Sequence, residues 1–159
     1  MSAVTERRRV AADVQEVWDR VTDMAAHGRH VPLTRITRQE ELALGGTFVM
    51  RTSLGPLGFD DPMTVTGFDP PPAQPARLRL VKSGRLLSGW AEIVVRAVDG
   101  AAEVSWTEEA VPTSALLRAL SRPADRLSRR ATSELLTRIL DGTLAGLPAL
   151  PPAPPHGRG

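Results

Sequence analysis

The feature that most constrains the fold of this chain is a series of short strand-like segments that ends in one long amphipathic segment. Turn signals separate the segments, and they include Gly45-Gly46, the LGPLG of residues 54–58 and Asp99-Gly100. Short strands at near-regular spacing favour an antiparallel meander, and Asp-Gly is typical of a hairpin turn. The expected strands are residues 4–10, 34–40, 47–53, 59–68, 77–81, 86–98 and 103–111.

A short amphipathic helix is expected directly after the first strand. Asp13 can cap its first turn, and Glu16 three residues later completes a capping-box pattern. A second helical segment over residues 23–27 is expected to stop at Gly28, with Pro32 preventing its continuation. The apolar residues of the first helix stand at i, i+3, i+4 and i+7, and we expect them in the core: Val14, Val17, Trp18 and Val21.

A long helix is expected towards the C-terminal end. Pro123 suits its first turn, and residues 114–120 could form one or two helical turns before it. An antiparallel sheet has one face to cover, and this helix is the only element large enough to cover it. A curved sheet closed around one helix leaves space between them, so we expect an internal cavity. The apolar face of the helix comprises Leu127, Ala131, Leu135, Ile139 and Leu140.

The predicted fold is therefore α+β. It has a curved antiparallel sheet of about seven strands, wrapped around a long C-terminal helix, with two short helices after the first strand. The 159 residues are enough for one domain with a real core. We expect that domain over residues 1–146 and a disordered Pro-rich tail, LPALPPAPPHGRG, over residues 147–159.

Composition excludes several classes of function. The chain has no Cys, which excludes disulfides and thiolate sites and fits a reducing, cytoplasmic location. Its first residues, MSAVTERRRVAA, lack the apolar segment of a signal peptide, and no run of about 18 apolar residues could span a membrane. The net charge is only +2 and the arginines are spread along the chain. We therefore expect neither a nucleic-acid partner nor integral membrane association.

A set of short motifs follows a fixed order along the chain. They are VxxVWDRVTD at residues 14–23, LGxxF at 44–48, DDPMTV at 60–65, FDPP at 68–71, GRLLSG at 84–89 and SWTEEAVP at 105–112. Together, over residues 3–146, they resemble actinobacterial proteins of the SRPBCC superfamily, whose START-like helix-grip fold is shared by polyketide cyclases and the birch-pollen allergen type. The resemblance implies this fold, but the superfamily has no universal catalytic motif to transfer.

The last expected strand carries the most informative candidate residues. Val104, Trp106 and Glu108 share one face by alternation, whereas Ser105 and Glu109 share the other. We interpret Trp106 as facing inward, because the other face is more polar, but the opposite orientation stays open. A buried Glu108 would have a raised pKa and could act as a general acid or base.

Other apolar residues of matching parity are candidates for the wall of the cavity. Met50 shares a face with Phe48, and Met63 shares one with Val65, so plain core and cavity lining both fit them. Methionine adapts its shape, which suits a pocket for flexible ligands. The candidate ligand-binding residues are Phe48, Met50, Met63, Val65, Leu80, Trp106, Glu108, Leu135 and Ile139.

His27 and His30 stand three residues apart and could share a helix face as zinc ligands. Gly28 interrupts that helix and no HExxH-type spacing is present, so we interpret them as loop residues near a pocket mouth. We expect no metal and no cofactor, since the GxSxG, Walker and GxGxxG signatures are also missing. The catalytic candidates are Glu108, then Asp61 and His30.

Three functions fit these observations. The first is binding of a small apolar or amphipathic molecule, such as a lipid, polyketide or aromatic metabolite, in the cavity. The second is an enzyme similar to polyketide cyclases or dehydratases, in which one cavity residue serves as acid or base. The third is a protein-interaction module whose cavity is filled by side chains, which the lack of a void above about 300 Å³ would favour.

Overall fold

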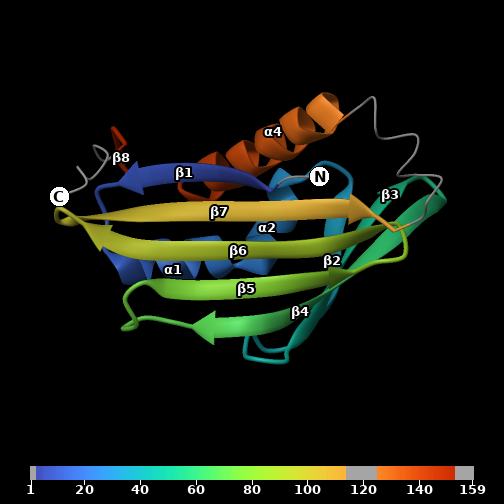
Figure 1. Cartoon of the computed structure of the whole chain (residues 1–159), viewed down its shortest axis with the longest axis horizontal. Coiled ribbons are helices and arrows are strands. Elements are labelled where there is room, and N and C mark those ends of the chain that lie inside the picture. The colour runs from blue at the N-terminus through green and yellow to red at the C-terminus, as the bar shows by residue number, and fades with distance from the viewer. Residues whose placement is uncertain (1–2, 114–124, 153–159) are drawn as a thin grey trace.

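The computed structural model describes residues 3–113 and 125–152, and its strands form one antiparallel sheet (Figure 1). The order of strands in the sheet is β2-β3-β4-β5-β6-β7-β1-β8, so β1 closes the meander by pairing with β7. This confirms the α+β helix-grip architecture. The strands are β1 (Val4–Val10), β2 (Thr34–Gln39), β3 (Thr47–Leu54), β4 (Leu57–Asp69), β5 (Ala76–Ser83), β6 (Leu87–Val98), β7 (Ala101–Pro112) and β8 (Ala149–Leu150).

The three described helices are α1 (Val14–Thr22), α2 (Met24–His30) and α4 (Asp125–Thr143). The Asp13 side chain accepts a hydrogen bond from the Glu16 backbone N–H at 2.7 Å, which confirms the predicted cap. The prediction that Gly28 stops α2 is wrong, because the helix continues to His30. At Gly28 the helix approaches the backbone of Arg35 in β2, and Pro32 follows where the chain turns extended.

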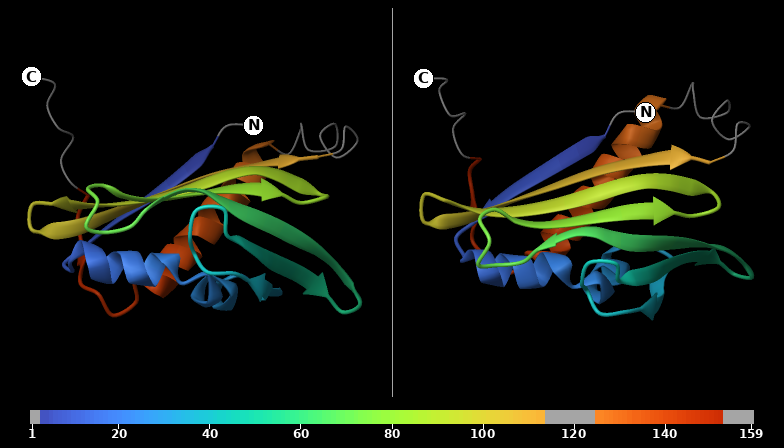
Figure 2. Two further views of the ribbon diagram at one scale, coloured as in Figure 1. Left: turned by 90° about the horizontal axis from the view of Figure 1, so that it is seen from below. Right: turned by 60° about the horizontal axis from the view of Figure 1, so that its bottom comes forward.

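All three helices lie on one face of the sheet, as Figure 2 shows from two directions. The helix α4 contacts β1 and α2, while α1 contacts β5, β6 and β7. The sheet bends through register shifts at Ile36/Arg38 and at Val65/Gly67, which bring β2–β4 around the helices. The space between the bent sheet and α4 is therefore enclosed on several sides.

The core forms where helices meet the concave face of the sheet. Trp18 of α1 is buried beside Phe68, with ring centroids 6.0 Å apart, so its assignment as scaffold is confirmed. From α4, Leu136 and Leu140 are fully buried, whereas Ala131 is exposed, contrary to expectation. The predicted positions Leu127 and 114–120 lie outside the residues whose side chains are described.

A short strand from the C-terminal region extends the sheet to eight strands. Within β8, Ala149 and Leu150 pair with Val10 and Arg9 of β1. These residues belong to the segment for which the sequence predicts disorder, so that prediction does not hold for 149–150. Residues 153–159 lie outside the described part of the chain.

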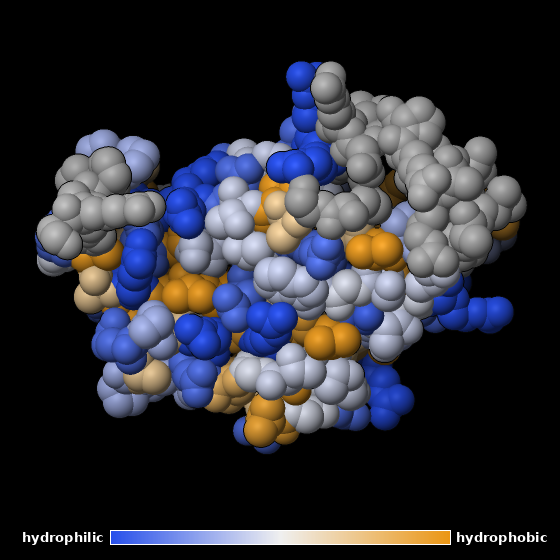
Figure 3. Space-filling view, in the orientation of Figure 1, coloured by the Kyte–Doolittle hydropathy of each residue, from blue (hydrophilic) through white to orange (hydrophobic). Residues whose placement is uncertain are grey.

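The convex face of the sheet is a mixed polar surface. In Figure 3 hydrophilic side chains alternate there with smaller apolar areas. Trp90 lies on this face, where its Nε1–H donates to Glu109 Oε2 at 2.9 Å and the Arg79 guanidinium stacks 4.5 Å from its ring centroid. Among the described residues, no helix is long and apolar enough to cross a membrane.

Candidate functional site

A cavity of about 260 Å³ lies between the concave face of the sheet, α2 and α4. Most of its wall is apolar. The alternation of β7 places Trp106 and Glu108 on this wall and Glu109 on the convex face, as the sequence analysis favoured. Eight of the nine candidate ligand-binding residues line it: Phe48, Met50, Met63, Leu80, Trp106, Glu108, Leu135 and Ile139.

The ninth candidate, Val65, is not part of the cavity wall. Val65 is buried in the core and follows Met63 by two residues on the same face of β4. Its backbone N–H and C=O bond to Gly46 and Gly45, which fix the β2–β3 loop against β4. Val65 therefore packs in the core beside this loop and does not line the ligand cavity.

A charged cluster lies on the cavity wall, and three strands contribute to it. Lys82 Nζ of β5 donates to Glu108 Oε1 of β7 at 2.6 Å and lies 3.9 Å from Asp61 Oδ2 of β4. The exposed fractions of these side chains are 10%, 9% and 13% for Lys82, Glu108 and Asp61, respectively. We call these three residues the buried charge cluster.

The small residues of β6 explain how this cluster forms. Strand β6 runs between β5 and β7, with Gly89 opposite Lys82 and Ala91 opposite Glu108. Because neither β6 residue fills the space above the sheet, the lysine stem can extend across β6 to the carboxylate. A Cβ at Gly89, where φ is +141°, would lie 2.0 Å from the Glu109 carbonyl oxygen, so no other residue fits there.

Burial and charge act in opposite directions on this cluster. Burial alone would lower the pKa of Lys82, but Glu108 and Asp61 beside it outweigh burial and raise that pKa, so the ammonium form persists. Burial raises the pKa of Asp61, and Glu108 adds to the shift, while Lys82 opposes it. Asp61 Oδ1 is buried and has no hydrogen-bond partner among the described residues.

Two aromatic side chains bring further polar atoms to the wall. The rings of His27 and Trp106 lie with centroids 4.9 Å apart, tilted by 47°. His27 Nε2 and Trp106 Nε1 are both buried without a partner in the described part of the chain. Burial lowers the pKa of His27 to about 4, although a hydrogen bond with the Val21 backbone opposes the shift. His27 is therefore neutral at pH 7.

Comparison with known proteins identifies the fold. No protein-family model and no curated protein sequence matches the chain. Among solved structures, the Zhui aromatase/cyclase from Streptomyces sp. R1128 superposes with a TM-score of 0.67 at 14% identity, covering 89% of this chain and 93% of that one. Ara h 8.0201 superposes with a TM-score of 0.60 at 12% identity, covering 91% and 99%. The chain has the START-like helix-grip fold.

A third similar structure is the di-domain ARO/CYC StfQ from the steffimycin biosynthetic pathway, with a TM-score of 0.67 at 14% identity. It matches 89% of this chain but 48% of StfQ. The START-like fold of this chain thus agrees with the resemblance that the sequence motifs carry. At such low identities the agreement concerns the fold alone.

Within this START-like fold, His30 is not at the cavity. Its imidazole packs against Gly142 of α4, where an added Cβ would lie 2.3 Å from His30 Nδ1. His27 instead lines the cavity, so the two histidines do not converge. The described residues contain no group of three or more His, Cys, Asp or Glu side chains that could hold a metal ion.

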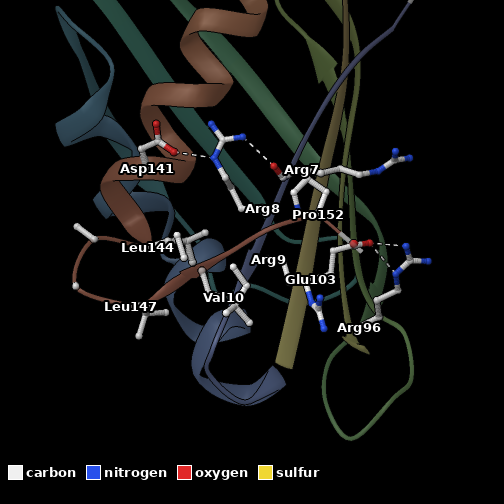
Figure 4. Close-up of a pocket in the computed structure, with 14 residues that line it drawn as sticks. Arg7, Arg8, Arg9, Val10, Arg96, Glu103, Asp141, Leu144, Leu147 and Pro152 are labelled. Carbon is white, nitrogen blue, oxygen red and sulfur yellow. Dashed lines mark hydrogen bonds and ion pairs between the residues drawn. The ribbon is translucent and has the colours of Figure 1, made fainter. Parts of the chain in front are cut away.

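A second hollow, of about 640 Å³, lies beside β1, β8 and the end of α4 (Figure 4). Arg8 Nε donates to Asp141 Oδ1 at 2.8 Å, and Arg96 pairs with Glu103. The Asp141 and Arg96 side chains are 58% and 51% exposed, so water already solvates these pairs. The hollow is larger, and one residue that lines it, Arg9, has a buried unpartnered atom, Nε. Three residues that line the inner cavity have such an atom, so we take the inner cavity as the candidate site.

Sequence reasoning missed two titratable residues of the inner cavity, Lys82 and His27. The expected strand over residues 77–81 ended before Lys82, whereas β5 extends to Ser83 and Lys82 lines the cavity. The signal was available, because Lys82 has the parity of Leu78 and Leu80. His27 was assigned to a loop because Gly28 was taken as a helix stop.

Proposed function

We propose that the chain binds a small hydrophobic or amphipathic molecule in the inner cavity. The observation that carries this proposal is an apolar cavity of about 260 Å³ with unpartnered polar atoms on its wall. Ligand pockets are typically apolar with a few convergent polar groups, and their volumes begin at about 300 Å³. The cavity lies just below that limit, on the side that the sequence analysis linked to a protein-interaction module. The proposal is therefore made for a compact ligand, such as a fused-ring aromatic molecule.

Affinity would come chiefly from the apolar wall. Each Å² of apolar surface removed from water contributes about 25 cal/mol, so a compact aromatic ring system can bind through burial alone. The polar atoms would then fix the orientation of the ligand. The similarity to the Zhui and StfQ aromatase/cyclases and to Ara h 8.0201 supports an internal ligand site in this fold.

A larger side chain inside the cavity should weaken binding without unfolding the protein. Ala110 lines the cavity near the end of β7, and Ala110→Leu would place a larger side chain inside it. We expect at least about tenfold weaker binding, because the lost contact area is worth about 1.4 kcal/mol or more. Native mass spectrometry of protein purified from its own host would identify the ligand, and calorimetry would then compare the variants.

The matched control for Ala110→Leu is Val111→Leu, on the neighbouring residue of β7 that is not part of the cavity wall. This control should bind as the unchanged protein does. Equal affinity of the Ala110→Leu variant, at an unchanged unfolding midpoint, would show that the ligand binds elsewhere.

A second candidate function is acid–base catalysis of a cyclase or dehydratase type. Asp61 is the specific observation in its favour, because it combines a raised pKa with a buried Oδ1 atom that has no partner among the described residues. Glu108, the first catalytic candidate from sequence, has its Oε1 atom occupied by Lys82. Asp61 is thus the better-placed group to take a proton from carbon next to a carbonyl.

The catalytic role is tested with Asp61→Asn. Loss of a general base typically costs about 10²–10⁴-fold in rate, so turnover of a β-hydroxy ketone to its conjugated enone, followed by absorbance, should fall at least 100-fold. Calorimetric binding of the same compound should change less than about threefold. Dehydration at an undiminished rate in this variant would remove Asp61 from the mechanism.

A further inference from the structure

The inner cavity leaves three buried polar atoms without partners in the described part of the chain: His27 Nε2, Asp61 Oδ1 and Trp106 Nε1. A buried polar group without a partner is destabilising, so a ligand that pairs with such a group gains affinity. The indole N–H of Trp106 can only donate, and a carboxylate oxygen of Asp61 accepts. A ligand that pairs with these atoms therefore needs both a hydrogen-bond acceptor and a hydrogen-bond donor.

The charges on the cavity wall restrict the ligand further. Among the described residues that line the cavity, the titratable side chains are His27, Asp61, Lys82 and Glu108. Lys82 is the only cation among them at pH 7, since His27 is neutral, and it is already held by Glu108 at 2.6 Å. The two carboxyl groups of Asp61 and Glu108 thus outnumber the one ammonium group.

An anionic ligand would meet an unfavourable field in this cavity. The anion would lose its hydration and enter a buried site beside two carboxylates. The one cation there, Lys82, already pairs with both of these carboxylates. A neutral hydroxyl would lose far less solvation, and it can donate to a carboxylate such as Asp61 or accept from an indole N–H such as that of Trp106. The two kinds of polar group should therefore differ in affinity at equal ring size.

We propose that the cavity selects its ligand by charge: it takes uncharged hydroxylated ring compounds, such as phenols and hydroxy ketones, and rejects carboxylates of the same size. This inference rests on the proposed ligand-binding function and adds the chemical class of the ligand. The unpartnered donor and acceptor on the wall select the hydroxyl, and the buried charge cluster excludes the anion.

The test is a comparison of 2-naphthol with 2-naphthoate at pH 7 by isothermal titration calorimetry. The ring system is the same in both probes, so the difference reports on the polar group. We expect 2-naphthol to bind at least about tenfold more tightly, a difference of about 1.4 kcal/mol. Equal or tighter binding of 2-naphthoate would overturn the inference while leaving the proposed function intact. Binding of neither probe would overturn both.

A charge-changing variant tests the cause of the selection. Glu108→Gln removes one carboxylate and leaves Lys82 less neutralised, so the affinity for 2-naphthoate relative to that for 2-naphthol should rise about tenfold. Asp60→Asn is the matched control, because Asp60 carries the same charge next to Asp61 but pairs with Arg51 outside the cavity wall.

If Glu108→Gln does not fold, Asp61→Asn takes its place. It removes the other carboxylate beside Lys82 and so makes the same change in charge. Circular dichroism and the unfolding midpoint establish folding before either titration. An unchanged preference for 2-naphthol in the folded variant would overturn the inference, since the buried charge cluster would then have no part in the selection. A rise for Asp60→Asn as large as for Glu108→Gln would do the same, because net charge alone would explain it.

Discussion

Replacing Lys82 by methionine is expected to lower the free energy of unfolding by about 3–5 kcal/mol at pH 7. Methionine keeps most of the length of the side chain but removes the ammonium group. Glu108 and Asp61, which are 9% and 13% exposed, would then be buried carboxylates without a counter-charge. Leaving a buried charge unpaired costs far more than the pair contributed, and this makes the effect large.

The pH dependence of the loss distinguishes its electrostatic cause from a packing defect. The raised pKa of Lys82 means that its contribution is complete at neutral pH and disappears only as the pH rises through that raised value. In Lys82→Met, acidification protonates the two carboxylates and removes the uncompensated charge. The deficit should therefore shrink between pH 7 and pH 4 in urea unfolding experiments.

Two further variants complete this experiment. Lys82→Met combined with Glu108→Gln should recover most of the lost stability, because a neutral amide replaces one stranded carboxylate. Arg79→Met removes a cation from the convex face of the same strand, where it pairs with Glu92 at 42% exposure, and should cost at most about 1 kcal/mol. A cost for Lys82→Met as small as for Arg79→Met would show that the buried charge cluster is well solvated.

The sequence predicted the fold because the fold depends on local patterns. The i, i+3, i+4, i+7 stripe of residues 14–21 gave α1, and alternation gave the parity of each strand. Alternation left two orientations for Trp106, and the polarity of the opposite face favoured the inward one, where the structure has it. Of the eight candidates that line the cavity, six were proposed from strand alternation, and Leu135 and Ile139 were proposed from the pattern of the long helix.

The buried charge cluster could not be predicted in the same way. It requires the register of four strands, with Asp61 on β4, Lys82 on β5 and Glu108 on β7, and with Gly89 in β6 leaving room between. Each residue has an ordinary local interpretation as a turn or rim residue. Only the pairing of the strands shows that Lys82 reaches over β6 to Glu108.

The position of His27 shows how tertiary contacts override a local stop signal. Gly28 is typical of a helix end, but here α2 continues to His30, whose ring lies against Gly142 of α4. His27 lines the cavity with its ring beside Trp106. These contacts join segments far apart in the sequence, so a local pattern cannot show them.

The largest pH effect at a single residue is expected from His27. It is buried, and burial lowers its pKa to about 4, whereas the unfolded chain has a value near 6.5. Because the unfolded state binds the proton first, stability is lost as the pH falls below about 6.5, until the folded state also becomes protonated near pH 4. Between pH 7 and pH 5 this group should remove about 2 kcal/mol of unfolding free energy.

His27→Phe and His27→Gln both remove the titrating group, the first keeping a ring beside Trp106 and the second a polar side chain. Each variant will have its own stability at pH 7, so the informative quantity is the change from pH 7 to pH 5 in urea unfolding. Both variants should lose about 2 kcal/mol less over this range than the unchanged chain. Parallel curves for all three proteins would mean that His27 is protonated as easily when folded as when unfolded, and that the inner cavity admits water to its imidazole.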